Sequence, residues 1–336
     1  MSRVSAESRS VLLLSGREVA ELLDPGSCVA AVERAFKLLG EGKALRPALC
    51  GLHAGDGGFH VKAAVLADEE GHPFFAAKIN ANFPDNPERW GLPTVQGAVL
   101  LMDGVCGAPL AVLDSAVLTA LRTAAATAVA AKHLARPDSS VLTLCGCGVQ
   151  GRAHLAFLAA VLPLRRVWLV DRDSSAVDHC AAEAARLGLE AHVAGDVRAA
   201  CRASDVCVTC TPGREVVVGA DDVRPGAFVA GVGADNESKQ ELDPTLLGRA
   251  KVVADLVEQC ARIGDLHHAL AAGALTVGDV YAELGDVVAG RKPGRTSADE
   301  IIVFDSTGMA LQDVAAAIVA YRRALAAGRG VRVELA

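Results

Sequence analysis

The glycines of segment 141–152 have the spacing of a phosphate-binding turn. Gly146, Gly148 and Gly151 form the pattern G-x-G-x-x-G directly after the apolar run 141–144. The first glycine permits a sharp turn, the second lets the backbone approach a pyrophosphate, and the third lets the next helix pack close to the strand. Free N–H groups at the start of that helix can bind phosphate oxygens. The alternative is a glycine turn without a ligand.

An acidic residue completes the pattern of a dinucleotide site. Asp171 follows the second apolar run, 167–170, and stands 20 residues after Gly151. A carboxylate at this distance can accept the ribose hydroxyls of an adenosine, whereas a plain glycine turn leaves it unexplained. Asp171 would repel a 2′-phosphate, so the sequence predicts NAD as the cofactor. Arg172 can offset part of that repulsion, which keeps NADP possible.

Three further charged residues lie in or beside apolar stretches. Lys78 is in the middle of the strand-like run 74–82, where an unpaired ammonium would be costly to bury. It either binds a group or extends to solvent from an edge strand. Arg122, expected in the first turn of an apolar helix, opposes the helix dipole unless an anion is near. Asp235 follows the strand-like run 228–232 and is either a site residue or a helix-capping or turn aspartate.

The elements that carry these residues fall into two patterns. From 141 to about 256, strands and helices alternate, which predicts a doubly wound parallel sheet of the Rossmann type. Its ligand-binding edge would include Thr211, Val232 and Asp235, each at a strand end. Before it, four strand-like segments separated by turns predict an antiparallel meander with little helical cover. Their ranges are 59–66, 74–82, 97–102 and 109–113.

The domain boundaries follow from these patterns. Arg136-Pro-Asp138 ends the apolar helix, and a strand at 300–305 precedes a long alanine-rich helix at 309–327. That helix is expected to pack back on the first domain. The fold class is therefore α/β, with a Rossmann NAD-binding domain at 136–306. A discontinuous α+β substrate and dimerisation domain would comprise residues 1–135 and 307–336.

Composition excludes several classes of protein. The chain has 33 basic and 40 acidic residues, a net charge of −7 and no run of basic residues, which argues against nucleic-acid binding. The longest apolar stretch, 123–131, is too short to span a bilayer, and 1–10 lacks the apolar core of a signal peptide, so we expect a cytoplasmic protein. The ten cysteines are scattered, which favours buried free thiols over disulfides or a metal site.

Further motifs are spread over nearly the whole chain. They are Lys78-Ile-Asn with Phe83-Pro-Asp-Asn86, Gly91-Leu-Pro-Thr-Val95, Gly107-Ala-Pro-Leu-Ala111, Leu121-Arg-Thr-Ala-Ala125, the glycine turn with Gln150, Gly233-Ala-Asp235 with Lys239-Gln-Glu-Leu242, and Phe304-Asp-Ser-Thr-Gly308. Taken together, these motifs resemble the ornithine cyclodeaminase/mu-crystallin family, and they are most similar to its archaeal alanine dehydrogenase and ketimine or pyrroline-2-carboxylate reductase members. Ala234, directly before Asp235, is more similar to archaeal alanine dehydrogenase than to ornithine cyclodeaminases.

The resemblance implies roles for individual residues. Arg46, otherwise a loop arginine, matches the residue that holds the substrate carboxylate, and Lys78 matches one that contacts the carboxylate and the reacting nitrogen. Arg122 matches an arginine between cofactor and substrate, and Asp235 matches the acid that exchanges a proton with the amine. Lys62, on the strand next to Lys78, is a further candidate. The expected cofactor contacts are Thr94, Arg122, Thr123, Gly146, Gly148, Val149, Gln150, Gly151, Asp171, Arg172, Thr211, Val232, Lys239 and Ser306.

The resemblance also implies an activity. Family members are homodimers that bind NAD(P), so we expect an NAD(H)-dependent oxidoreductase acting at the Cα–N bond of a small α-amino acid or its cyclic imine. One alternative is a cyclodeaminase, in which the same oxidation is followed by loss of ammonia and return of the hydride to the product. The other is a ligand-binding protein without turnover, similar to mu-crystallin.

Overall fold

The computed structural model describes residues 10–335, which form two compact units. The first unit comprises the chain up to Arg122 and the segment from Met309 onward. The second unit is the continuous segment Thr123–Gly308. One long helix, α4 (Ser115–Leu134), contributes residues to both units.

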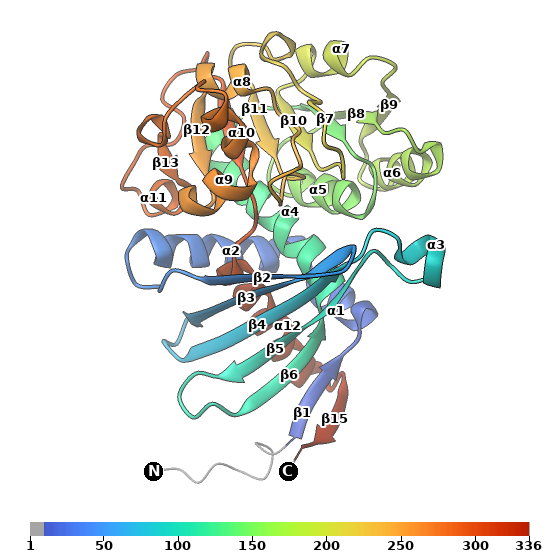
Figure 1. Ribbon diagram of the computed structural model, residues 1–336, viewed down its shortest axis with the longest axis vertical. Helices are drawn as coiled ribbons and strands as arrows, with labels where there is room; N and C mark the ends of the chain where they lie inside the picture. The colour runs from blue at the N-terminus through green and yellow to red at the C-terminus, as the bar shows by residue number, and fades with distance from the viewer. Residues whose placement is uncertain (1–9, 336) are drawn as a thin grey trace. The chain divides into compact units, whose positions relative to one another are not determined.

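The first unit is built on one sheet (Figure 1). Its strands are β1 (Ser10–Leu14), β2 (Ala48–Ala54), β3 (Gly57–Ala67), β4 (Pro73–Asn82), β5 (Val95–Asp103), β6 (Pro109–Asp114) and β15 (Val331–Glu334). Its helices are α1 (Gly16–Leu22), α2 (Pro25–Gly40), α3 (Asn86–Trp90), the beginning of α4, and α12 (Ala310–Ala327).

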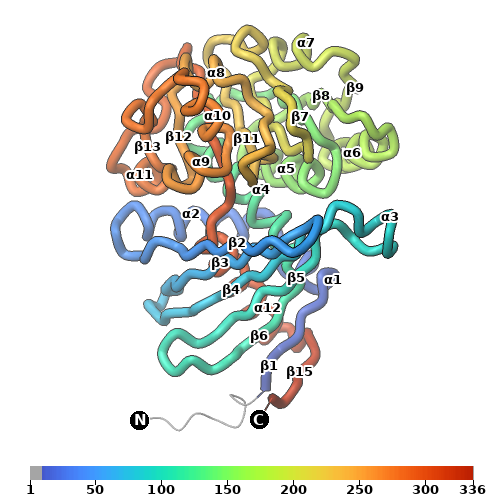
Figure 2. Tube along the Cα trace, viewed as in Figure 1, coloured from blue at the N-terminus to red at the C-terminus, as the bar shows by residue number. Residues whose placement is uncertain are grey.

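This sheet is larger than the predicted meander. Its strand order is β15-β1-β6-β5-β4-β3-β2, so the prediction of four strands was wrong, although all four predicted strands are present. The strands that were not predicted include β1 and β15, at the two ends of the described chain. These two strands pair antiparallel with each other (Figure 2). The prediction of little helical cover was also wrong, since α12 packs against β3, β4 and β5.

The face of the sheet that α12 covers is the buried one. On β4, Phe74, Ala76 and Lys78 are all buried, while the alternating residue Ile79 is 50% exposed on the other face. β4 pairs with β3 on one side and β5 on the other. The edge-strand alternative for Lys78 is therefore wrong, and its ammonium is enclosed rather than extended to solvent.

The second unit contains the parallel sheet and its helices. Its strands are β7 (Val141–Cys145), β8 (Arg166–Val170), β9 (Glu190–Val193), β10 (Val206–Thr209), β11 (Phe228–Gly231), β12 (Lys251–Ala254), β13 (Ala282–Glu283) and β14 (Ile302–Asp305). Its helices are the rest of α4, α5 (Val149–Ala159), α6 (Ser174–Arg186), α7 (Val197–Arg202), α8 (Pro244–Arg249), α9 (Val257–Ile263), α10 (Asp265–Ala271) and α11 (Leu284–Val288), with short 3-10 turns η2 (Ala220–Asp222) and η3 (Val277–Asp279).

The parallel sheet is doubly wound, as the sequence predicts. Its order is β13-β12-β14-β11-β10-β7-β8-β9, and every neighbouring pair is parallel. The chain winds outward from β7 through β8 and β9, then returns to β10 and winds the other way. The switch point lies between β7 and β10. In such sheets the carboxyl ends of the strands at the switch point form the ligand site.

Helix α4 differs from the prediction at its start. It begins at Ser115, so Arg122 lies about two turns into the helix rather than in its first turn. The helix dipole acts mainly within the terminal turns, so it does not account for this arginine. The charge of Arg122 is instead balanced by the carboxylate of Asp313 on α12.

The cysteine side chains are mostly buried thiols. All ten cysteines are free, and most are buried as expected, but Cys50 and Cys106 are exposed. Within residues 10–335, no helix is long and apolar enough to cross a membrane. In the same range, no three His, Cys, Asp or Glu side chains are grouped so that they could hold a metal ion.

Candidate active site

The glycine turn has the geometry of a pyrophosphate cradle. Gly146 has a φ of +99°, and a Cβ there would lie 2.8 Å from the Cys210 carbonyl oxygen. A Cβ on Gly151 would lie 2.0 Å from the Gly146 oxygen, so only glycine lets α5 start this close to β7. Gly148 instead faces open space, with no atom within 4 Å of a Cβ position. The turn therefore leaves room beside Gly148 and at no other glycine of the motif.

The start of α5 is free to bind an anion. Gly148 is its N-cap and no side chain caps the helix. The orphan N–H groups of an uncapped helix bind phosphate oxygens well. The first helical residue, Val149, is 63% exposed, and Gln150 Oε1 is buried without a partner among the described residues. This donor set fits a dinucleotide.

Asp171 lies directly after β8 and is tied to the glycine turn. Its Oδ2 accepts a hydrogen bond from Cys147 N at 2.6 Å, and its Oδ1 accepts one from Asp173 N at 3.0 Å. Each carboxylate oxygen keeps a further lone pair that can accept a ribose hydroxyl. Arg172 lies 3.6 Å from Glu215 on the surface. Both side chains are almost fully exposed, so this ion pair is weak, and the preference against a 2′-phosphate rests on Asp171.

A buried glutamate that sequence reasoning missed holds two of the loops at the switch point. Glu241 Oε1 accepts from Thr211 N at 2.6 Å, and its Oε2 accepts from Gly233 N at 2.7 Å. These N–H groups follow β10 and β11: that of Thr211 lies in the first loop, and that of Gly233 lies between Val232 and Asp235 in the second. Burial raises the pKa of Glu241. The only sequence signal was its place in the motif 239–242.

Asp235 forms an ion pair within its own loop. Its Oδ1 lies 2.7 Å from Lys239 Nζ, and the Asp235 side chain is 51% exposed. His268 Nε2 lies 2.8 Å from the Lys239 carbonyl oxygen and fixes the same segment. No helix begins at 236–240, so the helix-cap alternative for Asp235 is wrong. Asp235 is an accessible carboxylate beside a fixed cation.

The loop that carries Ser306 is held by Asp255. Asp255 Oδ2 accepts from Ser306 Oγ at 3.2 Å and from Gly308 N at 2.6 Å. Gln259 Nε2 donates to Thr307 Oγ1 at 2.7 Å. The loop is therefore ordered by buried polar contacts from α9 and the end of β12, and the sequence carried no sign of these partners.

Two more carboxylates are buried beneath these loops. Asp265 Oδ1 accepts from Glu241 N at 2.8 Å, and Asp305 Oδ2 accepts from Leu266 N at 2.8 Å. Burial raises the pKa of Asp265 to about 7, and burial together with Asp265 raises that of Asp305 well above its usual range. Asp305 is fully buried, so it is not available to a substrate.

In the first unit, Lys78 lies in a buried polar cluster. Its Nζ donates to Asp313 Oδ1 at 2.9 Å and to Thr119 Oγ1 at 3.2 Å. Burial, and then the neighbouring Arg122, lower the pKa of Lys78 to about 7, while Asp313 opposes that shift. Burial would raise the pKa of Asp313, but the two cations outweigh it and hold the pKa below its usual value.

Arg122 shares the same carboxylate. Its Nε lies 2.9 Å from Asp313 Oδ1 as an ion pair without hydrogen-bond alignment, and its Nη1 donates to Gln312 Oε1 at 2.8 Å. Gln312 Nε2 and Asp313 Oδ2 are buried and have no partner among residues 10–335. Buried polar atoms are normally satisfied, so this cluster has the character of a site that accepts a polar ligand.

The other predicted residues of the first unit lie on its loops and strands. Lys62 on β3 is opposite Lys78 on β4. Arg46 is exposed in the loop before β2, and Thr94 is half-buried just before β5. Thr123, in the second unit, is 7% exposed on α4. The structure thus brings together Lys78 and Arg122 in one unit and, in the other, the glycine turn, Asp171, Thr211, Asp235 and Ser306 at strand ends.

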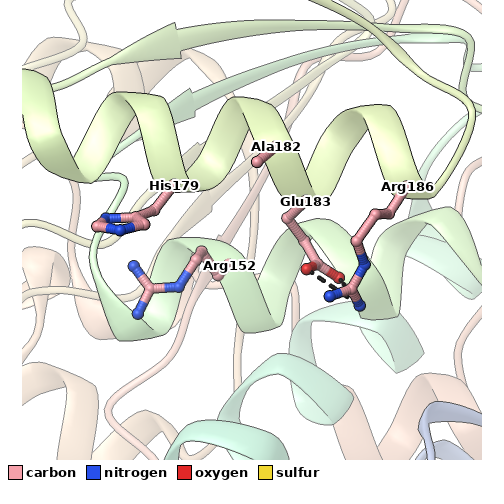
Figure 3. A pocket seen from close by; sticks show the side chains of 5 residues that line it. All are labelled: Arg152, His179, Ala182, Glu183 and Arg186. Carbon is pink, nitrogen blue, oxygen red and sulfur yellow. Dashed lines mark hydrogen bonds and ion pairs between the residues drawn. The ribbon is translucent and has the colours of Figure 1, made fainter.

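A separate surface pocket lies between α5 and α6. It is lined by Arg152, His179, Ala182, Glu183 and Arg186. Arg152 and His179 lie near each other across the two helices, and Glu183 pairs with Arg186 at 3.3 Å along α6 (Figure 3). None of these residues belongs to the predicted site.

Comparison with known proteins gives a consistent result. Residues 9–328 match the model of the ornithine cyclodeaminase/mu-crystallin family. An alanine dehydrogenase of Archaeoglobus fulgidus is 39% identical over 323 residues, covering 96% of this chain and 98% of the relative. A solved archaeal alanine dehydrogenase dimer with bound NAD is 38% identical, with a TM-score of 0.92, and covers 97% of this chain and 100% of that one.

A second solved structure is also similar along its whole length. It is the Δ1-pyrroline-2-carboxylate reductase of Thermococcus litoralis in complex with NADH and L-proline. It is 32% identical, with a TM-score of 0.90, and covers 96% of this chain and 100% of that one. The predicted family resemblance and fold class are confirmed.

Proposed function

The chain belongs to the ornithine cyclodeaminase/mu-crystallin family, and from that premise we propose that it is an NAD-dependent oxidoreductase acting at the Cα–N bond of a small α-amino acid or its imine. The observation that carries the substrate class is the excess positive charge of the Lys78–Arg122 cluster. Two buried cations share the single carboxylate of Asp313. A buried charge without full compensation is costly, so the cluster favours a ligand with its own carboxylate.

The cofactor of the enzyme is NAD, and when bound it supplies or accepts the hydride. The N–H groups of α5 and the open side of Gly148 would hold the pyrophosphate, and Asp171 would hold the adenosine ribose. Glu241 fixes the backbone at Thr211 and Gly233, which sets the position of two further contact loops. We place the cofactor domain at 136–306 and the substrate domain at 1–135 with 307–336.

We assign the substrate-handling steps to individual residues, as the family resemblance implies. Lys78 and Arg122, with Arg46, would bind and orient the substrate carboxylate through charge-assisted hydrogen bonds. Asp235 would take the proton from the amine nitrogen during oxidation and return it during reduction. Its ion pair with Lys239 holds the carboxylate in one orientation. Positioned proton transfer of this kind contributes roughly 10²–10⁴-fold to a rate.

We also propose a homodimer formed by the first unit. The uncovered face of its sheet carries exposed apolar side chains, among them Phe59, Val65 and Ile79. A contiguous exposed apolar face is typical of an interaction surface, and the similar archaeal alanine dehydrogenase is a dimer. Light scattering at micromolar concentration should give twice the 34.5 kDa chain mass, and a monomer would contradict this proposal.

The substrate should be an imine acid or a 2-oxo acid with ammonia, rather than ornithine. A cyclodeaminase must also hold a terminal ammonium, but the polar residues that follow Lys78 on β4, Asn80 and Asn82, are neutral. Asp305, a remaining carboxylate candidate, is fully buried. A short or cyclic acid needs no second charged partner.

A substrate panel tests this proposal. Purified enzyme is offered cyclic imine acids, 2-oxo acids with ammonia, and L-amino acids including ornithine, each with NADH or NAD⁺, and NADPH or NADP⁺ in parallel. Both nicotinamide absorbance and free ammonia are recorded. We expect NADH-linked reduction of an imine or 2-oxo acid to be fastest. Ammonia release from ornithine without net NADH change would identify a cyclodeaminase, and binding without turnover of any compound would identify a ligand-binding protein.

A further inference from the structure

We propose that Asp313 is a positioning residue: its carboxylate orients both Lys78 and Arg122 so that each keeps N–H donors for the carboxylate of the substrate. This inference rests on the proposed function, because it assigns a partner to the residues that bind the substrate there. Asp313 lies in the alanine-rich helix α12, far along the chain from both cations.

The geometry is that of a bridge through one oxygen atom. Asp313 Oδ1 lies 2.9 Å from Lys78 Nζ and 2.9 Å from Arg122 Nε. All three side chains are almost completely buried. The cations come from a strand and from a different helix, β4 and α4. Fixing both through one atom sets the distance between them, which a flexible pair of long side chains would not keep.

Counting donors shows what remains for a ligand. Lys78 donates to Asp313 and Thr119, which leaves one of its N–H donors. Arg122 uses Nη1 for Gln312 and directs Nε at Asp313, so other guanidinium donors remain. Gln312, the residue next to Asp313, therefore accepts a hydrogen bond from a second nitrogen of the same guanidinium. A carboxylate ligand can accept from both cations at once.

The charge balance explains why one acid is present and not two. With Asp313 ionised and Lys78 protonated, which holds below a pH of about 7, Lys78 and Arg122 leave a net positive charge, and Lys62 stands opposite Lys78 on β3. A second acid would neutralise the site and remove its attraction for a carboxylate. Without any acid, the cations would repel each other in a low-dielectric interior, and Lys78 would lose its proton more readily. Asp313 keeps the cluster cationic and assembled.

The groups that face Lys78 make the effect of removing Asp313 predictable. Arg122 from α4 and Lys62 from β3 lower the pKa of Lys78, Thr119 from α4 is neutral, and Asp313 from α12 raises it. In Asp313→Asn the pKa of Lys78 falls below about 7. The protonated fraction of Lys78 is then lower in the variant than in the wild type, and the ratio between the two proteins is larger at pH 8 than at pH 6. The loss of substrate binding relative to the wild type therefore grows with pH.

The test compares three variants of the whole enzyme saturated with NADH. In Asp313→Asn, we expect KM for the best acid substrate at pH 8 to rise roughly ten- to hundredfold, the range for losing a hydrogen bond to a charged group. The rise at pH 6 should be smaller. Asp313→Glu keeps the charge and should restore most of the binding. NADH affinity, measured by fluorescence, should change much less than KM in both variants, because Arg122 is only one of the expected cofactor contacts.

Asp68→Asn is the matched control. Asp68 is a buried acid of the same unit that pairs with Arg322, outside the proposed site. It reports what loss of an ion pair made by a buried carboxylate does to the fold alone. If KM and its pH dependence in Asp313→Asn equal those in Asp68→Asn, or if Asp313→Glu is as impaired as Asp313→Asn, the inference is wrong.

A binding measurement separates this inference from the proposed function. Pyruvate is titrated by calorimetry into the wild-type protein and Asp313→Asn, each saturated with NAD⁺. Binding to the wild type that is weakened in Asp313→Asn supports the inference even when no compound of the panel is turned over. Turnover by the wild type, with pyruvate binding equally well to Asp313→Asn, overturns the inference and leaves the function standing. Absence of both turnover and pyruvate binding in the wild type contradicts both.

Discussion

Lys62 on β3 and Lys78 on β4 are directly opposite each other in an antiparallel strand pair, so their side chains share the buried-side face of the sheet. Like charges directly opposite each other on neighbouring strands disfavour the charged form. Lys62 is accordingly one of the cations that lower the pKa of Lys78, after burial and Arg122. The neighbouring strand therefore tunes the group that is expected to bind the substrate.

Replacing Lys62 with Gln should move the pH dependence of catalysis upward. Removing this charge raises the pKa of Lys78 above about 7, so Lys78 stays protonated to a higher pH. The basic limb of the kcat/KM profile should shift to higher pH, opposite to the shift in Asp313→Asn. Lys62→Arg keeps the charge and should show no shift. A profile for Lys62→Gln that coincides with that of Lys62→Arg would count against this coupling.

Two glycines of one motif should respond differently to alanine. Gly148 has a φ of −69° and open space at its Cβ position, so Gly148→Ala should fold normally. Its methyl group would occupy the phosphate approach, and NADH affinity should fall by about tenfold or more, which is ~1.4 kcal/mol. Gly151→Ala would place a Cβ 2.0 Å from the Gly146 oxygen and should destabilise the fold by about 1–3 kcal/mol.

Fluorescence titration with NADH and thermal denaturation of both variants check this contrast. Each variant serves as the control for the other, since the substitution is the same and the positions are three residues apart. Normal NADH affinity in a stable Gly148→Ala protein would mean that the pyrophosphate does not approach Gly148.

Asp265 should make the fold less stable as the pH rises. Its folded-state pKa is about 7, above its ordinary value of 3.8, so the folded protein retains a proton that the unfolded chain has lost. The free energy of unfolding should therefore decrease between about pH 4 and pH 7, and the penalty is complete above that range. In Asp265→Asn the amide oxygen can still accept from Glu241 N and Leu242 N, and no charge forms.

Urea denaturation at several pH values tests this linkage. The stability of Asp265→Asn should fall less than that of the wild type between pH 5 and pH 8. Parallel curves for the two proteins would show that Asp265 does not titrate in this range.

Replacing Asp235 with Asn should nearly abolish turnover and leave cofactor binding intact. The amide cannot exchange the proton on the substrate nitrogen, a loss of roughly 10²–10⁴-fold in rate. Asp221→Asn is a suitable control, because Asp221 is an exposed acid in the same unit that pairs with Arg249 at 3.1 Å. Steady-state rates and NADH fluorescence should be measured for both. A near wild-type rate in Asp235→Asn would mean that another group handles the proton.

Local signals predicted much of this fold. The glycine motif with Asp171 indicated the β7–α5–β8 unit. The strand-like run 74–82 predicted β4, with Lys78 inside it. These features depend on neighbours within a few residues, and the sequence shows such neighbours directly.

The partners that complete the site were not predictable in the same way. Asp313 and Lys78 are 235 positions apart, and an acid in an alanine-rich helix carries no sign of its partner. Glu241 likewise gave no indication that it binds backbone N–H groups after two different strands. The strand β15 was missed because a short exposed strand at the end of a chain is stabilised by its pairing with β1 and not by its own pattern.

The origin of the hydrogen at Cα tests the central claim most directly. The best substrate of the panel is reduced with NADH carrying deuterium at either face of nicotinamide C4, and the product amino acid is analysed by mass spectrometry and NMR. The proposed function predicts that one of the two labelled cofactors transfers its deuterium to Cα, with one NADH consumed for each product. A product that carries no label from either cofactor, formed with release of ammonia and no net consumption of NADH, would contradict it.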